Sequence, residues 1–300
     1  MADSVQDLLT NMSNALVERE RLARPLVVKI SVQGHRVRSG TLWRKDVVIA
    51  AEQGFPELGE ARVTLAGGSS LVAQVAGRDS GTNVIAFRLA GGPDPAPLPA
   101  AEPKAGALVL ALGAAEDGAS VRLGLIHSVG TAWHSRAGGR IDRRIILDIN
   151  LGHREEGGPV IDSGGGLLGM STLGPRRSVL VIPSATVDSV IEPLLSEGRV
   201  ERGWLGVALQ PVLLPEALQT VAGQSHGLII MGTSKDGPAA RASLQVGDIL
   251  LSVGGESVAS PITVAQRLGP DSVGQQIELR LIRAGAPQTL QATVGVRPPK

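Results

Sequence analysis

The stretch NLGHREEGGPVIDSGGGLLGMS, residues 150–171, contains two short apolar runs separated by glycines. Because the runs PVID and LLGMS are of strand length and flank SGGG, they predict a β-hairpin with a glycine turn. The segment GGGLLG formally fits the dinucleotide-binding pattern G-x-G-x-x-G. That pattern requires a strand before the glycines and a helix after them, whereas here a second strand follows. The stretch therefore predicts an antiparallel sheet rather than a nucleotide site.

Similar runs continue on both sides of this hairpin. About a dozen short segments rich in Val, Ile and Leu lie between residues 25 and 183, separated by Gly, Asp, Pro or Arg-Lys turns. The 39 glycines and 19 prolines of the chain are typical of many turns. Since no long helix interrupts the series, the sequence predicts a mainly β fold of closed or sandwiched antiparallel sheets.

Two helices are expected beside these strands. Residues 4–20 have apolar positions at helical spacing, with Ser4 and Asp7 able to cap the start and Pro25 following the end. The apolar positions of this helix are Val5, Leu8, Leu9, Met12 and Leu16. A second helix is predicted in ATVDSVIEPLLSEGRV, residues 185–200, with Val187, Val190, Ile191 and Leu194 on one side.

The domain organisation follows from a change of texture near residues 197–203. Beyond it, strands mix with two helical patches over about a hundred residues, the size of a small domain. We expect an N-terminal amphipathic helix at 1–24, one domain at 25–198 and a second domain at 199–300.

Composition excludes several classes of function. The 300 residues include 29 basic and 28 acidic side chains without a basic run, which argues against nucleic-acid binding. The absence of Cys excludes disulfides and thiol nucleophiles. Apolar residues never run together for about 18 positions, so no membrane span is predicted. The first 25 residues have no secretory-signal pattern, so a cytoplasmic location is expected.

Several motifs occur in the order and approximate spacing of a known family. DVVIAAEQGF (46–55), GRDSGTNVIAFRL (77–89) and INLGHREEGGPVIDSGGGLLGM (149–170) resemble three signatures of HtrA/DegP-like, trypsin-fold serine proteases. RGWLGVALQ (202–210) and GPAARASLQVGDILLSVGG (237–255) resemble the PDZ domain that follows such proteases. The resemblance implies a trypsin/chymotrypsin-like double β-barrel followed by a small α+β PDZ domain.

The catalytic positions of the family differ in this chain. The positions matching the catalytic His, Asp and Ser are Glu52, Asn83 and Glu156, and the oxyanion-hole Gly is replaced by Arg154. A triad needs a hydroxyl, an imidazole that accepts its proton and a carboxylate that orients the imidazole. The resemblance with these replacements predicts a catalytically degenerate pseudoprotease, so we expect no enzyme activity and no cofactor.

Two enzymatic alternatives use the same positions. If the fold holds, Glu52 and Glu156 come close together, and paired carboxylates are also found in glycosidases. The carboxylates of Glu52, Glu155 and Glu156 with the imidazole of His153 offer oxygen and nitrogen ligands for a divalent metal. The alternative function is therefore an atypical or metal-assisted peptidase that uses the Glu52/Glu156 cleft.

The PDZ resemblance implies a peptide groove. PDZ domains extend a strand with a bound peptide and hold its C-terminal carboxylate with backbone N–H groups. The residues expected to contact the peptide are Trp204, Leu205 and Gly206 in the carboxylate loop, Val207, Ala208 and Leu209 in the strand, and Val264, Ala265 and Leu268 in the helix. We expect a protein-binding scaffold, adaptor or chaperone that binds C-terminal or extended peptides, and the resemblance implies a homotrimer.

Overall fold

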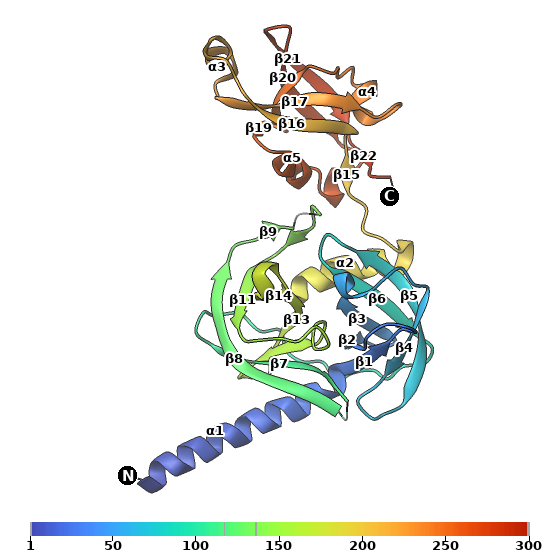
Figure 1. Ribbon diagram of the computed structural model, residues 1–300, viewed down its shortest axis with the longest axis vertical. Helices are drawn as coiled ribbons and strands as arrows, with labels where there is room; N and C mark the ends of the chain where they lie inside the picture. The colour runs from blue at the N-terminus through green and yellow to red at the C-terminus, as the bar shows by residue number, and fades with distance from the viewer. Residues whose placement is uncertain (1, 117, 136, 299–300) are drawn as a thin grey trace. The chain divides into compact units, whose positions relative to one another are not determined.

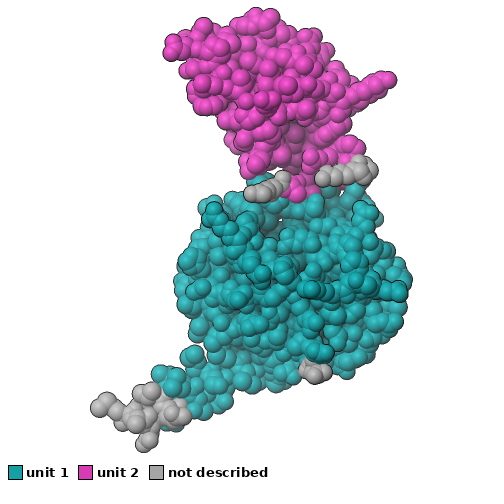
Figure 2. All heavy atoms as spheres, in the orientation of Figure 1, with its two compact units in different colours: residues 1–135, 140–200 teal, residues 136–139, 201–300 magenta. Residues whose placement is uncertain are grey.

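A computed structural model describes residues 2–116, 118–135 and 137–298, with side chains described from residue 7 onward. The chain forms two compact units (Figures 1 and 2). Residues up to 135 together with 140–200 make up the first unit, and the remaining residues make up the second. The predicted mainly β architecture, with a double barrel followed by a PDZ domain, is confirmed.

The first unit begins with helix α1 (Ala2–Ala23), which is followed by a 3₁₀ turn at Arg24–Leu26. The α-helix ends before Pro25, because proline has no N–H to donate to the carbonyl four residues earlier. The helix already begins before Ser4, and the side chains of Ser4 and Val5 lie outside the described residues. Leu8, Leu9 and Met12 are exposed, so only the C-terminal part of the helix packs on the barrels, through Leu16 and Ala23.

The first barrel is a closed six-stranded sheet in the order β1-β2-β3-β6-β5-β4. Its interior is filled by aliphatic side chains around Phe55 and Phe87, whose ring centroids lie 5.5 Å apart in an edge-to-face arrangement. The strands are β1 (Val27–Ser31), β2 (Arg38–Arg44), β3 (Val47–Ala51), β4 (Glu60–Thr64), β5 (Ser70–Asp79) and β6 (Val84–Leu89).

The second barrel is closed in the order β11-β14-β13-β12-β7-β8. It contains the β12–β13 hairpin, whose predicted glycine turn is confirmed. Gly165 has φ +88°, and the carboxylate of Asp162 accepts the N–H of Gly166 at 2.8 Å. The strands are β7 (Leu108–Ala115), β8 (Gly118–Gly130), β11 (Arg144–Asp148), β12 (Pro159–Asp162), β13 (Leu167–Leu173) and β14 (Val179–Pro183), with a short pair β9 (Trp133–His134) and β10 (Arg140–Ile141).

Helix α2 (Ser184–Glu197) packs against both barrels. The four apolar residues predicted on one side are all buried, and they join side chains from β3, β6 and β13 in one core between the barrels. The helix ends at Gly198, which takes the left-handed conformation that glycine adopts without a steric cost (φ +73°). This shared core holds the facing loops of the two barrels in fixed positions.

The second unit contains a six-stranded sheet in the order β16-β17-β18-β20-β21, with β19 paired to β18. Its core lies between the sheet and two short helices, α4 and α5. The elements are β15 (Gly203–Trp204), β16 (Val207–Leu213), α3 (Glu216–Ala222), β17 (His226–Thr233), α4 (Pro238–Arg241), β18 (Ile249–Val253), β19 (Glu256–Ser257), α5 (Pro261–Arg267), β20 (Gln276–Arg283), β21 (Ala286–Thr293) and β22 (Gly295–Val296).

Candidate functional site

Glu156 lies between the two barrels and is 3 % exposed. One of its carboxylate oxygens, Oε1, accepts three hydrogen bonds. The donors are the hydroxyl of Thr172 at 2.8 Å, the backbone N–H of Leu173 at 2.9 Å and the side-chain amide of Gln53 at 2.5 Å. A carboxylate that accepts several such bonds is held firmly in one rotamer. Glu156 therefore anchors the end of its loop to β13.

Asn83 and Gln53 complete this network. The side-chain oxygen of Asn83 accepts the backbone N–H of Gln53 at 2.8 Å, and its amide donates to the Thr172 hydroxyl at 2.7 Å. Asn83 has φ +58°, a left-handed conformation that asparagine tolerates better than most residues. The contacts run from Asn83 through Gln53 to Glu156, the order in which carboxylate, imidazole and hydroxyl follow one another in a triad.

Glu52 is directed elsewhere, which differs from the expectation that it approaches Glu156. Its carboxylate accepts hydrogen bonds from the guanidinium of Arg78 at 2.8 and 3.1 Å. The same guanidinium donates to the carbonyls of Phe55 and Pro56. A 3₁₀ turn begins at Glu52, and in it the side chains of Glu52 and Gln53 point in different directions. Gln53, rather than Glu52, therefore contacts Glu156.

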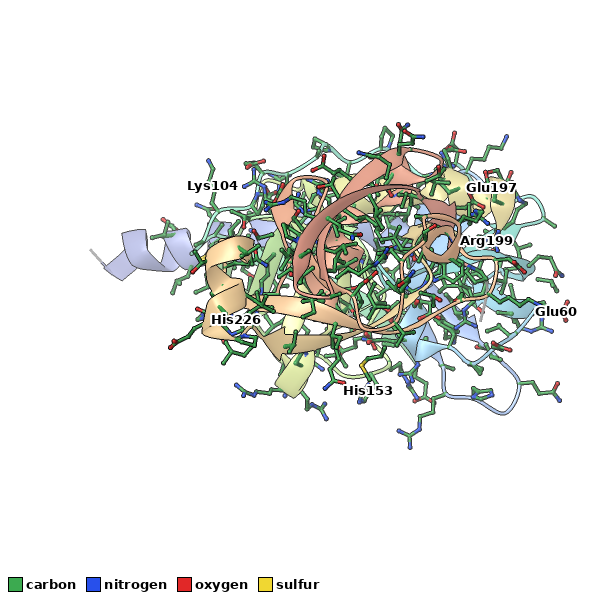
Figure 3. The ribbon with its side chains drawn as sticks, turned by 90° about the horizontal axis from the view of Figure 1, so that it is seen from above. Glu60, Lys104, His153, Glu197, Arg199 and His226 are labelled. Atoms are coloured by element: carbon green, nitrogen blue, oxygen red, sulfur yellow. The ribbon has the colours of Figure 1, made fainter. Side chains whose placement is uncertain are left out.

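The loop before Glu156 is bound to β2 through its backbone. The carbonyl of Arg154 accepts both the N–H of Ser39 at 2.8 Å and its hydroxyl at 2.6 Å. The carbonyl of His153 accepts a hydrogen bond from Arg38 at 2.6 Å. These contacts turn the carbonyls of the loop toward the first barrel, while the side chains of His153 and Arg154 remain exposed. Figure 3 labels His153.

Glu155 has a structural partner of its own. Its buried carboxylate accepts hydrogen bonds from Arg122 at 2.9 and 3.2 Å and from the N–H of Gly152 at 2.8 Å. Burial raises the pKa of this carboxyl, but the hydrogen bonds from Arg122, Gly152 and Ser120 and the charge of Arg122 outweigh it, so the pKa is lowered.

The candidate metal ligands do not converge. Glu52 is held by Arg78, Glu155 by Arg122 and Glu156 by the β13 network, while the imidazole of His153 is exposed. Among the residues that the structure describes, no group of three or more His, Asp or Glu side chains is placed to hold a metal ion. The geometry gives no support to a metal-assisted peptidase.

The chemistry of the network is that of a fixed hydrogen-bonded cluster. Thr172 supplies its hydroxyl, which donates to Glu156 and accepts from Asn83 and Gln53. This side chain is 3 % exposed. Gln53, Asn83 and Glu156 supply no hydroxyl and no imidazole, so hydrolysis by this chain requires other groups than a serine–histidine pair at these positions.

Glu156→Ala is expected to destabilise the first unit by about 3 kcal/mol, because it leaves the Leu173 N–H and the buried Thr172 hydroxyl without their acceptor. Glu156→Gln, which can keep an oxygen at the same place, should cost less than about 1 kcal/mol. Urea unfolding of the full chain measures both. Glu57→Ala, at an exposed position of the same unit, is the control. Equal losses for the Ala and Gln variants would contradict the role of Oε1.

The second unit has a groove between β16 and α5. Strand β16 is at the edge of its sheet, so one side of its backbone is not paired to another strand. Val207 and Leu209 are half-buried and line the groove, together with Val264, Ala265 and Leu268 of the opposite wall. Ala208 is exposed, since alternate residues of a strand face opposite sides. Its backbone, but not its side chain, belongs to the groove.

The loop at one end of the groove contains Trp204, Leu205 and Gly206. In the described part of the chain, the N–H groups of Leu205 and Gly206 donate to no backbone carbonyl, whereas both carbonyls are used, by Ala239 and Ser234. Gly206 has φ +75°, and a Cβ built there would lie 3.0 Å from the Trp204 ring. A side chain at this position would therefore disturb the loop itself.

The comparisons with known proteins agree with this fold. The family of trypsin-like peptidase domains matches residues 38–170, and the family of PDZ domains matches residues 229–283. A solved structure titled "HtrA-type protease AlgW with decapeptide" superimposes with a TM-score of 0.75. The two chains are 22 % identical, and the superposition covers 94 % of this chain and 98 % of the other.

Curated relatives carry protease names. A probable periplasmic serine endoprotease, DegP-like, from Brucella suis is 31 % identical over 53 % of this chain and 32 % of its own length. A protein of the same name from Halomonas elongata is 28 % identical over 92 % of this chain and 61 % of its own length. The chain thus spans less than two thirds of the length of these relatives.

These names correct two expectations. The prediction that the chain is not an enzyme is wrong, because the curated relatives are named serine endoproteases, which points to a protease. The cytoplasmic location is also wrong, since the relatives are named periplasmic. In the part of the chain that the structure describes, no helix is long and apolar enough to cross a membrane.

The identity of the chain rests on agreement between independent observations. The two closed barrels, the shared core between them and the sheet with a groove beside its edge strand are the parts that the motifs imply. The matching families lie in the same order along the sequence. The chain is an HtrA/DegP-like protein in which a trypsin-like peptidase domain is followed by a PDZ domain.

Proposed function

We propose that this protein captures the C-termini or extended segments of other proteins in the groove between β16 and α5 and acts on them in the periplasm. The observation that carries the proposal is the unpaired edge of β16 beside an apolar wall, because a bound peptide can add a strand there. The periplasmic location follows the names of the relatives. Homotrimer formation remains a prediction from the family.

We assign a separate role to each domain of the chain. Residues 199–300 bind the peptide, residues 25–198 form the trypsin-like scaffold on which the client is held, and residues 1–24 form an N-terminal helix. In the groove, the N–H groups of Leu205 and Gly206 bind the terminal carboxylate, and Val264, Ala265 and Leu268 contact the last side chain. The aliphatic side chains of this wall favour an apolar C-terminal residue, and we expect a small one. An adaptor or chaperone role rests on the same groove.

Ala265→Glu tests the groove without touching the glycine loop. Ala265 is half-buried on α5, so a glutamate there places a carboxylate where the peptide should bind. Binding of a fluorescent decapeptide ending in valine, measured by anisotropy on the full chain, should weaken about tenfold or more. Ile262→Glu introduces the same charge at an exposed position of the same helix and should leave the affinity unchanged.

Two further measurements test the capture of the carboxylate and the cleavage of the peptide. A decapeptide with an amidated C-terminus should bind more weakly, and equal binding would contradict capture of the carboxylate. Mass spectrometry of the same samples measures cleavage, the activity to which the relatives' names point. If cleavage occurs, comparison with Glu156→Gln shows whether the Glu156 carboxylate takes part. Unchanged binding by Ala265→Glu would overturn the proposed groove.

A further inference from the structure

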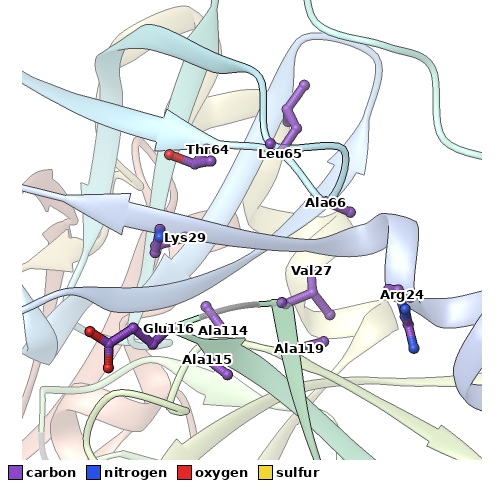
Figure 4. A pocket seen from close by; sticks show the side chains of 12 residues that line it. Arg24, Val27, Lys29, Thr64, Leu65, Ala66, Ala114, Ala115, Glu116 and Ala119 are labelled. Carbon is purple, nitrogen blue, oxygen red and sulfur yellow. The ribbon is translucent and has the colours of Figure 1, made fainter.

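A cavity separate from the peptide groove and from the Glu156 network lies in the first unit (Figure 4). It is bounded by the start of β1, the β4–β5 hairpin and the β7–β8 hairpin. Its volume is about 290 Å³. Ligand pockets begin at about 300 Å³, so this cavity has the size for a small metabolite and not for a peptide or a nucleotide.

Part of the cavity wall consists of small apolar side chains, and polar side chains form the rest. Val27 contributes from β1, and Ala114, Ala115 and Ala119 contribute from the β7–β8 hairpin. A Cβ added to Gly68 would meet no atom within 4 Å. Gly68, Ala66 and Glu116 are exposed, so the cavity is a hollow open to solvent and accessible to a small ligand.

Lys29 carries the positive charge of the cavity. It is half-buried on β1 and is paired across the sheet with Thr64 of β4, so both side chains face the same side. The Thr64 hydroxyl is bonded to Ser70 at 2.8 Å. Among the described residues, Lys29 forms no ion pair within 4 Å. A half-buried ammonium without a carboxylate partner favours a bound anion.

Arg24 and Glu116 define the rest of the charge pattern. The guanidinium of Arg24 is bound by both carboxylate oxygens of Glu20, at 2.7 and 2.9 Å, so its charge is already compensated. Glu116, at the end of the β7–β8 hairpin, is exposed and forms no ion pair within the described part of the chain. Figure 4 shows Lys29 and Glu116 toward one side of the cavity and Arg24 toward the other.

We propose that this cavity binds a small α-amino acid with a short aliphatic side chain. The ligand's carboxylate pairs with Lys29, its ammonium faces Glu116, and its side chain packs against the alanines. Among the lining residues that the structure describes, Lys29 is an unpaired cation and Glu116 is an unpaired anion toward the same side of the cavity, which matches a zwitterion. A simple carboxylate leaves Glu116 without a partner and is repelled by it.

The test is calorimetric titration of the full chain with L-alanine, L-valine and propionate. The amino acids should bind more tightly than propionate, which lacks the ammonium group. Lys29→Met keeps the aliphatic stem and should weaken amino-acid binding about tenfold or more, since it removes a hydrogen-bonded charge pair. Ala119→Leu should weaken it by filling the space. Lys45→Met, at an exposed turn between β2 and β3, should have no effect.

Thermal unfolding first establishes that the variants are folded. Amino-acid binding that is lost in Lys29→Met and Ala119→Leu, and kept in Lys45→Met, supports the site. Absence of amino-acid binding to the wild type at millimolar concentration overturns it. Binding that is equal in wild type and Lys29→Met also overturns it, and propionate binding as tight as L-alanine binding overturns the assignment of a zwitterion.

Discussion

Gly158→Ala is expected to prevent the first unit from folding stably. A Cβ built at Gly158 would lie 1.9 Å from the carbonyl oxygen of Leu112 and 3.3 Å from the Cα of Gly113. Both are backbone atoms of β7, so no side-chain rotation can relieve the overlap. We expect a loss of more than about 4 kcal/mol, in the range reached only by severe steric or buried-charge defects.

This loss is comparable with the whole stability of a domain, about 5–15 kcal/mol. Differential scanning calorimetry and the yield of soluble protein measure it. Gly59→Ala is the matched control, because a Cβ added there meets no atom within 4 Å. Equal unfolding temperatures of the Gly158→Ala and Gly59→Ala proteins would contradict the close approach of Gly158 to β7.

The second large effect is expected in the PDZ unit, at Asp248. This carboxylate is 2 % exposed and is bonded by Arg283 at 2.7 and 2.8 Å and by the backbone N–H of Gln245 at 2.8 Å. Asp248→Ala leaves the Arg283 charge without its partner and the Gln245 N–H without an acceptor. Asp248 is buried but Arg283 is partly exposed, so we expect a loss of about 1–3 kcal/mol, mainly from the Gln245 N–H that loses its acceptor.

Hydrogen exchange of the full chain, followed by mass spectrometry, measures this effect locally. Amides of β18 and β20 should lose protection in Asp248→Ala, while those of the barrels should not. Asp271→Ala removes an exposed carboxylate of the same unit and should leave the exchange unchanged. Equal protection of β18 in the two variants would contradict the importance of the pair.

The same pair predicts a dependence on pH. Burial raises the pKa of Asp248, but the hydrogen bonds from Arg283 and Gln245 and the charge of Arg283 outweigh it, so the pKa in the folded protein is lowered. The stabilisation is therefore complete above the unfolded pKa, about 3.9, and is lost as the pH falls toward the folded value. The PDZ unit should lose stability in acid more steeply in the wild type than in Asp248→Asn. Equal slopes would contradict this assignment.

The sequence by itself determined the features that depend on local pattern. The strand runs, the glycine turn at 163–166, the buried side of α2 and the order of the two domains were predicted from periodicity, turn residues and motifs, and the structure contains them. These signals are local because each depends on residues close together in the chain. By contrast, the expectations of a non-enzyme and of a cytoplasmic location were wrong. The replaced triad positions do not by themselves determine the activity of the whole protein, and the first 25 residues do not determine its compartment.

Only the tertiary structure decided which side chains meet. The family resemblance placed Glu52 beside Glu156, but a single 3₁₀ turn directs Glu52 to Arg78 and Gln53 to Glu156. Likewise, no local pattern shows that Lys29 faces an alanine-lined cavity, because its walls come from hairpins far apart in the sequence. A shift by one position along the chain leaves the sequence pattern almost unchanged but gives each side chain a different partner. These partners are set by packing between strands that are distant in the sequence.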